Sequence, residues 1–205
     1  MRIITIEQIR SFIAIELPDE LKRRLGELEA RLQPGTQSWT KWVDPNSIHL
    51  TLKFLGNIGA NRTSEITGAI EEAAQEMPPF RLEVRGLGAF PNLNRVQVVW
   101  VGIGGEVDKL SHLQHRIDSS MERLGFTPES RSFTPHFTLA RVRDQASLDE
   151  RQRLGQLIAS TDYAIPYILD VNSVSLMRSQ LTRAGATYTR IGSVKLGNPL
   201  SRNNP

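Results

Sequence analysis

Two short stretches with one shared pattern constrain this chain more than any other feature of its sequence. The stretch at 49–52 reads HLTL and the stretch at 136–139 reads HFTL, so in each the threonine stands two positions after the histidine. A strand turns successive side chains to opposite faces. The pattern therefore predicts that each histidine shares a strand face with its threonine, while the apolar residues between them turn toward a core.

The two stretches carry side chains that suit acid–base chemistry on a small anionic group. Histidine has an ordinary pKa of about 6.5, so near neutral pH one ring can act as a base and another as an acid. A threonine hydroxyl can donate its hydrogen to a phosphate oxygen. We therefore predict that His49 and His136 are catalytic. Thr51 and Thr138 are predicted to bind phosphate. Spacing alone leaves open which histidine is the acid.

Periodicity and turn residues predict alternating strands and helices along the rest of the chain. The last expected helix has Ser147 as its N-cap, with Glu150 completing a capping box. The expected helices span 18–32, 62–77, 106–124 and 147–160. The expected strands span 10–16, 39–43, 47–55, 80–90, 95–103, 133–142, 165–177 and 187–196.

The order of strand, helix, motif strand, helix and strand occurs twice. The motif histidines stand at positions 49 and 136, an offset of 87 residues. This pattern predicts an internal repeat of roughly 10–90 and 95–178 within one domain of 1–205, followed by a flexible tail at 197–205. Two units related by a pseudo-two-fold axis would bring equivalent strands together, which is a physical reason for one site to be built from two motifs.

Composition excludes several classes of function. The chain has 205 residues, a formal net charge of +3 and no cysteine. Without cysteine there is no disulfide, no thiolate zinc site and no cysteine nucleophile, which fits a cytoplasmic location. The sequence contains no apolar run of about 18 residues, so no membrane span is expected. His112 and His115 have no acidic cluster beside them, so we expect no metal site.

The amino-acid sequence around the motifs resembles the sequences of a known family. The stretches 10–15, 42–56 and 135–141 are similar to the RNA 2′,3′-cyclic phosphodiesterase family, also called the 2′-5′ RNA ligase family, of the two-histidine (2H) phosphoesterase superfamily. The similarity covers roughly 10–196. It implies an α+β fold of two pseudo-symmetric lobes, each a mainly antiparallel sheet with helices on its outer side and an active-site cleft between them.

The resemblance also implies a reaction. His49 would protonate the leaving ribose oxygen and His136 would accept a proton from water, so that a ribonucleoside or RNA 2′,3′-cyclic phosphate opens to a 2′-phosphate. Weak reverse 2′-5′ ligation of RNA would be possible. The expected partners are RNA or nucleotides with cyclic phosphate ends. No cofactor, membrane or obligate protein partner is implied.

Three further residues are expected near the site. Arg141 stands at the position of a family arginine thought to help bind substrate phosphate, but strict alternation puts it on the face away from His136 unless the strand bends. Lys53 falls on the His49 face by alternation. Phe12 matches a family aromatic that could stack on a base, although core packing would explain it equally well.

Two alternative functions fit the same residues. One is a cyclic phosphodiesterase for a small metabolite such as ADP-ribose cyclic phosphate. The other is a module that binds RNA ends without catalysis, which the intact histidines and threonines argue against.

Overall fold

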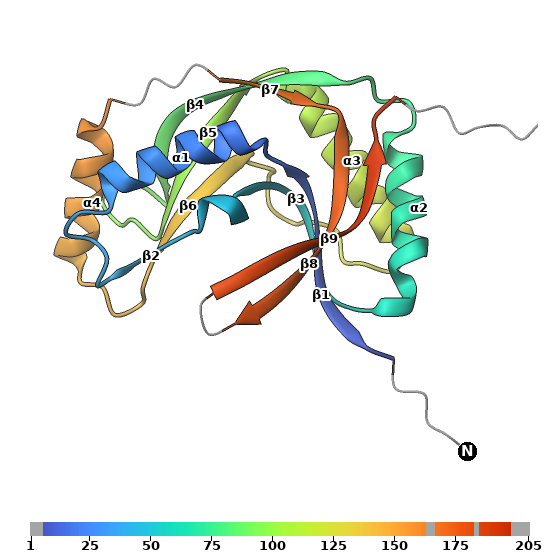
Figure 1. The fold of residues 1–205 in the computed structure, drawn as a ribbon, viewed down its shortest axis with the longest axis horizontal. Coiled ribbons are helices and arrows are strands. Elements are labelled where there is room, and N and C mark those ends of the chain that lie inside the picture. The colour runs from blue at the N-terminus through green and yellow to red at the C-terminus, as the bar shows by residue number, and fades with distance from the viewer. Residues whose placement is uncertain (1–5, 163–166, 183–184, 198–205) are drawn as a thin grey trace, which may run out of the picture.

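The strands of this chain form two antiparallel sheets. A computed structural model describes residues 6–162, 167–182 and 185–197, and within them one sheet has four strands in the order β3-β1-β8-β9 and the other has five in the order β2-β6-β5-β4-β7 (Figure 1). The strands are β1 (Gln8–Glu16), β2 (Thr40–Trp42), β3 (His49–Gly59), β4 (Phe80–Phe90), β5 (Val98–Gly105), β6 (His136–Val142), β7 (Tyr167–Val171), β8 (Ser173–Thr182) and β9 (Gly185–Lys195). This arrangement confirms the predicted two-lobed α+β fold.

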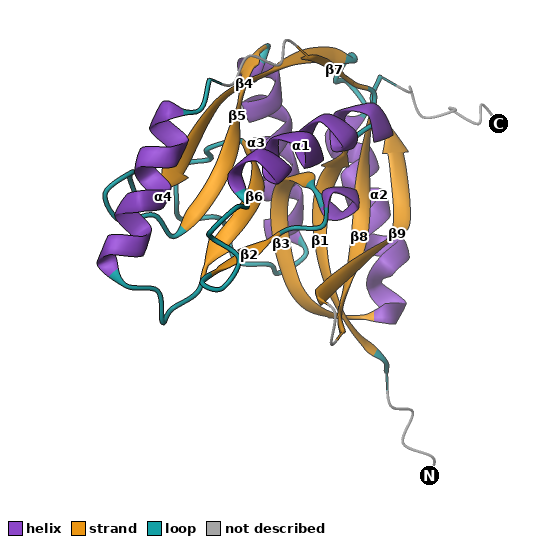
Figure 2. Ribbon diagram, turned by 60° about the vertical axis from the view of Figure 1, so that its left-hand side comes forward, coloured by secondary structure: helices purple, strands orange, loops and turns teal. Residues whose placement is uncertain are grey.

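Helices cover both sheets. α2 and α3 pack together beside the four-stranded sheet, and α4 packs on β4 of the five-stranded sheet (Figure 2). The helices are α1 (Asp19–Leu32), α2 (Thr63–Ala74), α3 (Val107–Arg123) and α4 (Leu148–Ser160), and the 3₁₀ turns are η1 (Pro45–Ser47) and η2 (Ala60–Arg62). Within the described ranges, none of these helices has the length and apolar character that crossing a membrane requires.

Local sequence signals explain where the helices lie. Four leucines at helical spacing form the buried face of α1, as the sequence predicts: Leu21, Leu25, Leu28 and Leu32. The predicted capping box of α4 is also present. The Ser147 hydroxyl accepts the backbone N–H of Glu150, and the Glu150 carboxylate accepts the backbone N–H of Ser147 at 2.7 Å.

One core passes through both sheets. It includes buried residues of both, such as Ile13 of β1 and Val101 of β5. The opposite face of the four-stranded sheet carries a separate small apolar cluster of Phe12, Ala14 and Met177. The two faces of this sheet are therefore both partly apolar, and the small cluster lies on the face that the motif histidine shares.

The strand predicted at 165–177 is two strands in different sheets, and residues 165–166 of it lie outside the described ranges. β7 pairs with β4, whereas β8 pairs with β1. The core positions are odd-numbered before the crossing, as at Leu169 and Val171, and even-numbered after it, as at Val174 and Leu176. The chain changes sheets at Asn172, so a single alternating strand is the wrong interpretation of this segment.

The first motif strand is also longer than predicted. The sequence suggests an end near Leu55, because Gly56 and Asn57 are typical of turns. In the structure β3 continues to Gly59, and Gly56 adopts a φ of 72° inside the strand. Glycine adopts this left-handed conformation without steric cost. Here the conformation accompanies an irregularity in the pairing with β1, and no turn forms. The expected tail at 197–205 lies outside the described residues from 198 onward.

A buried acid on α1 makes the stability of the fold depend on pH. Glu29 is 1% exposed, and among the described residues its Oε1 has no hydrogen-bond partner. Burial, with a smaller contribution from the charge of Asp44, raises the pKa of Glu29 from 4.5 to about 8. Between these two values the unfolded chain releases a proton that the folded chain keeps. The free energy of unfolding therefore falls as pH rises from about 4.5 to about 8.

Glu29→Gln removes this titration while preserving the shape of the side chain. We expect the melting temperature of the variant, relative to the wild type, to rise between pH 5 and pH 8, because each unit of pKa shift corresponds to about 1.4 kcal/mol. Calorimetric melting at several pH values measures the difference. Glu27→Gln, on the exposed side of the same helix, is the matched control and should show no such trend. A Glu29→Gln difference that is constant with pH would contradict the assignment.

Candidate active site

The two motif strands come from different sheets and approach each other. β3 begins at His49 and β6 begins at His136. Cα atoms of these two strands come within 8 Å of one another across the sheets. The fold therefore brings the two segments that carry the predicted site residues into one region of the molecule.

The His49 ring is held by one hydrogen bond and two aromatic neighbours. Its Nδ1 lies 2.8 Å from the backbone carbonyl of Ser47. Because a carbonyl can only accept, Nδ1 carries the hydrogen, and the lone pair of the neutral ring is on Nε2. Phe12 stacks on the imidazole with 4.6 Å between centroids, and Tyr188 meets it edge-on at 5.0 Å.

The His136 ring is held in the same way. Its Nδ1 donates to the carbonyl of Thr134 at 2.7 Å, again two residues before the histidine. Phe90 of β4 meets this ring edge-on, with 5.0 Å between centroids. Both imidazoles therefore have the same tautomer when neutral, with Nε2 left to exchange a proton with a bound molecule.

The surroundings of the two rings lower both pKa values. Burial is the main cause at His49, and the bond to the Ser47 carbonyl partly offsets it. Burial is also the main cause at His136, where the bond to the Thr134 carbonyl raises the pKa and the positive charge of Arg141 lowers it further. Both burial and a nearby positive charge disfavour the charged ring. Among the described residues, an arginine affects the titration of His136, but none affects that of His49.

An extra residue in β6 decides which side chains accompany His136. The residue opposite Val99 of β5 is Ala140, but the residue opposite Trp100 is Thr138. Leu139 is therefore an additional residue in β6, which makes this a β-bulge. Alternation of faces restarts at such a point, so positions on either side of it no longer follow one even–odd rule.

The bulge places Arg141 on the face of His136. Along β6, Phe137, Leu139, Ala140 and Val142 are buried, while His136 and Thr138 are half-buried and Arg141 is exposed. Strict alternation would turn Arg141 to the opposite face. The register shift is the bend that the sequence analysis required for Arg141 to reach the site.

The same shift occurs in β3. Ile13 of β1 lies opposite Lys53, but Ala14 lies opposite Thr51, so one residue is again inserted between them. Phe54 consequently shares the face of Thr51, and its side chain is 63% exposed. Phe54 holds the position in β3 that Arg141 holds in β6.

The expectation that Lys53 lies on the His49 face is wrong, because the bulge turns this residue inward. Its side chain is 2% exposed and forms an ion pair with Asp118 of α3. The ammonium group also donates to the carbonyl of Thr127 at 2.8 Å. Lys53 thus ties the first motif strand to the segment that leads toward His136. A buried lysine with two partners is satisfied and is not a charge offered to a ligand.

Phe12 is also buried rather than free to meet a base. It is 3% exposed and lies beneath the His49 ring. Three aromatic residues near the histidines were not predicted from the sequence, namely Tyr188, Phe90 and Trp100. Each comes from a strand without a motif, and only the pairing of distant strands places it here.

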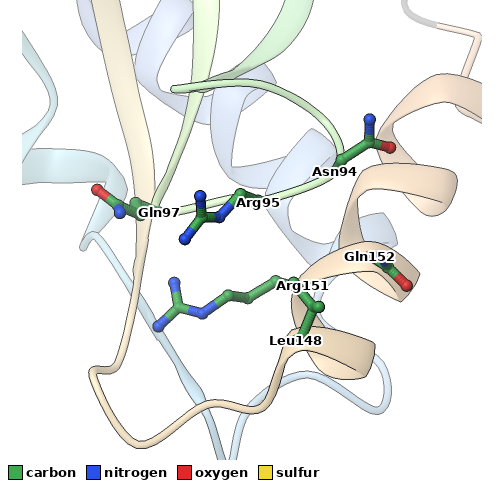
Figure 3. Close-up of a pocket in the computed structure, with 6 residues that line it drawn as sticks. All are labelled: Asn94, Arg95, Gln97, Leu148, Arg151 and Gln152. Carbon is green, nitrogen blue, oxygen red and sulfur yellow. The ribbon is translucent and has the colours of Figure 1, made fainter.

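A hollow in the described structure lies elsewhere. It measures about 920 Å³ and lies between the segment before β5 and the start of α4 (Figure 3). Its lining includes Arg95, Gln97 and Arg151, but none of the five predicted site residues. The Arg151 guanidinium donates to the carbonyls of Val96 at 2.8 Å and Arg143 at 2.9 Å. Arg151 therefore links the segment before β5 to the segment after β6. This hollow is not the candidate site.

Known proteins match this chain along most of its length. The curated RNA 2′,3′-cyclic phosphodiesterase of Methanothermobacter thermautotrophicus is 32% identical over 182 residues, which cover 89% of this chain and 96% of that protein. The curated protein of the same name from Aeropyrum pernix is 34% identical over 155 residues, covering 76% and 85%.

Solved structures share the fold. The crystal structure of TT0787 from Thermus thermophilus superposes with a TM-score of 0.75 at 26% identity and covers 92% of this chain and 98% of that one. E. coli LigT complexed with 3′-AMP gives a TM-score of 0.72 at 25% identity, covering 93% and 99%. The model of the 2′-5′ RNA ligase superfamily matches residues 17–183. With two histidine motifs on converging strands and these relatives, the chain belongs to the 2′-5′ RNA ligase superfamily.

Proposed function

We propose that this protein is a phosphodiesterase that hydrolyses 2′,3′-cyclic phosphate ends of RNA or ribonucleotides. The observation that carries the proposal is the matched pair of imidazoles, each held through Nδ1 by a backbone carbonyl so that Nε2 is available. The names of the curated relatives support the same activity. A cytoplasmic location is part of this proposal.

Hydrolysis would begin at His136. Its Nε2 takes a proton from water, and the water oxygen forms a bond to phosphorus. The bond from phosphorus to the 3′ oxygen breaks, and His49 protonates that oxygen, which leaves a 2′-phosphate. The position of Arg141 supports this division of roles, because its charge favours the neutral ring that a base requires. Among the described residues no cation acts on His49 in the same way, which suits the acid.

Donors on the site face would hold the phosphate. Thr51 and Thr138 lie on the faces of their histidines and are half-buried, and each can donate a hydroxyl hydrogen to a non-bridging oxygen. Arg141 can add a charge-assisted hydrogen bond as negative charge builds on those oxygens. The exposed ring of Phe54 offers a flat apolar surface for a base.

The internal repeat predicted from the sequence is part of the proposal. In each half, the motif strand pairs with the first strand of that half, β3 with β1 and β6 with β5. Each sheet is completed by a strand from the other half, because β8 pairs with β1 and β4 pairs with β5. Duplication with exchange of β4 and β8 accounts for these pairings and for bulges at equivalent positions, while β2 is an additional strand of the first half in the sheet of the second.

Two finer activities follow from the same residues. Run in reverse, the pair of histidines would join a 5′-hydroxyl to a cyclic phosphate, giving weak 2′-5′ ligation of RNA. A small metabolite with a cyclic phosphate, such as ADP-ribose cyclic phosphate, presents the same reacting group. Comparing its turnover with that of cyclic-ended oligonucleotides separates the two substrate classes.

We expect His49→Ala and His136→Ala each to lower kcat for a ribonucleoside 2′,3′-cyclic phosphate by about 10² to 10⁴, because each removes a positioned acid or base. Turnover is measured in excess chelator, and the product is separated to distinguish 2′- from 3′-phosphate. His112→Ala, at an exposed position of α3, is the matched control and should keep the wild-type rate. Wild-type rates in both site variants, or loss of wild-type activity with chelator, would refute the mechanism.

The lowered pKa values predict a pH profile. Both free histidines titrate below the ordinary 6.5, so kcat/KM should peak on the acid side of that value. A bound phosphate anion favours the charged rings and raises both pKa values. The maximum of kcat should therefore lie at a higher pH than that of kcat/KM. Coincident maxima, or a kcat/KM maximum well above pH 7, would argue against the pair as acid and base.

Arg141→Gln tests the assignment of the base. Removing the charge should raise the pKa of His136 and leave that of His49 unchanged, which an NMR titration of the two rings measures separately. KM should rise about tenfold or more, since a hydrogen bond to a charged group contributes about 1.5–3 kcal/mol. An equal shift at both histidines, or none at His136, would show that Arg141 does not act on this ring.

A further inference from the structure

A second basic residue lies beside Arg141. β2 is the outermost strand of the five-stranded sheet, and its middle residue, Lys41, is directly opposite Arg141 in the pairing with β6. Residues directly opposite in an antiparallel pair have Cβ atoms about 4.5–5.5 Å apart and point to the same face. Lys41 and Arg141 therefore leave the sheet side by side.

The face that they share is the face of His136. The neighbours of Lys41 along β2 turn inward, with Thr40 buried and Trp42 half-buried, while Lys41 is exposed. The charge of Arg141 in turn lowers the pKa of His136. Positive charge thus extends from Arg141, beside the His136 ring, to Lys41 at the edge of the sheet.

This pair is costly unless an anion lies against it. Like charges directly opposite each other in a sheet are destabilising. Within residues 6–162, 167–182 and 185–197, no carboxylate lies within 4.0 Å of either basic group, and neither side chain donates a hydrogen bond. Arginines elsewhere in the protein differ, because Arg23 and Arg81, for example, each pair with a carboxylate.

We propose that Lys41 forms a second phosphate subsite, which holds the phosphodiester one nucleotide upstream of the cyclic phosphate, while Arg141 beside it stays on the cyclic phosphate. This inference rests on the proposed function, because the cyclic phosphate at the histidines sets the position of the next one. An RNA strand would then cross from His136 toward the β2 edge of the sheet. The subsite makes an oligonucleotide end a better substrate than a mononucleotide, since only the oligonucleotide has a phosphodiester there.

The test compares three substrates with wild type and Lys41→Ala. They are a trinucleotide with a 2′,3′-cyclic phosphate end, a nucleoside 2′,3′-cyclic phosphate, and the same nucleoside carrying a 5′-phosphate. We expect the wild type to favour the trinucleotide, and Lys41→Ala to reduce the ratio of trinucleotide to nucleoside kcat/KM by about tenfold. Each phosphate contact to single-stranded nucleic acid contributes about 0.7 to the slope of log affinity against log salt. The slope for the trinucleotide should fall by about that amount.

Control variants separate charge from structure. Lys41→Arg keeps the charge and should restore the preference. Lys109→Ala removes a lysine of α3 that pairs with Glu106 and should leave the ratio unchanged. If the 5′-phosphorylated nucleoside shows the full preference, the subsite binds a terminal phosphoryl group and the proposal of a phosphodiester is overturned.

The outcomes also separate this inference from the proposed function. If wild type and Lys41→Ala hydrolyse all three substrates, with the same trinucleotide-to-nucleoside ratio of kcat/KM and the same salt slope, the subsite is overturned and the activity stays in place. If no cyclic substrate is hydrolysed, the proposed function fails. Binding of the trinucleotide with a terminal 2′-phosphate, measured by titration, then decides on the subsite. An unchanged Kd in Lys41→Ala rejects the subsite. A higher Kd that depends less on salt supports the subsite.

Discussion

The composition of the site depends on one extra residue in each motif strand. Without the bulge, Arg141 would lie on the covered side of its sheet and Lys53 would lie beside His49. With it, the arginine joins the site face and the lysine enters the interior, where Asp118 neutralises it. A strand that kept strict alternation could not place histidine, threonine and the residue three positions further on one face.

Backbone carbonyls then determine what the rings can do. The carbonyls of Ser47 and Thr134 each bind Nδ1 of the histidine two residues later, which selects the same neutral tautomer twice. Burial keeps both rings ready to lose a proton. An approaching phosphate reverses that preference. In the proposed mechanism, substrate binding and the protonation of the acid are therefore linked, since the anion supplies the favourable field that the protein withholds.

The sequence predicts local features well and pairing poorly. Some features depend only on neighbours along the chain, so the sequence pattern is enough to predict them. These are the helix spans, the capping box at Ser147 and the shared face of each histidine and threonine. The bulges depend on how two strands align. The adjacent apolar residues Leu139 and Ala140 do mark one of them, but Lys53 conceals the other, because a lysine in a strand suggests a surface position. The sheet change at Asn172 leaves only a shift between odd and even core positions.

The unequal partners at matching bulges have a consequence for orientation. Phe54 and Arg141 occupy corresponding places, yet one is an aromatic ring and the other a cation. Two-fold related halves with identical contents would accept a nucleotide and its reversed copy equally well. Under the proposed function, a heterocycle would favour one half and an oxyanion the other. Under that proposal, the polarity with which a strand enters depends on this pair of non-identical side chains.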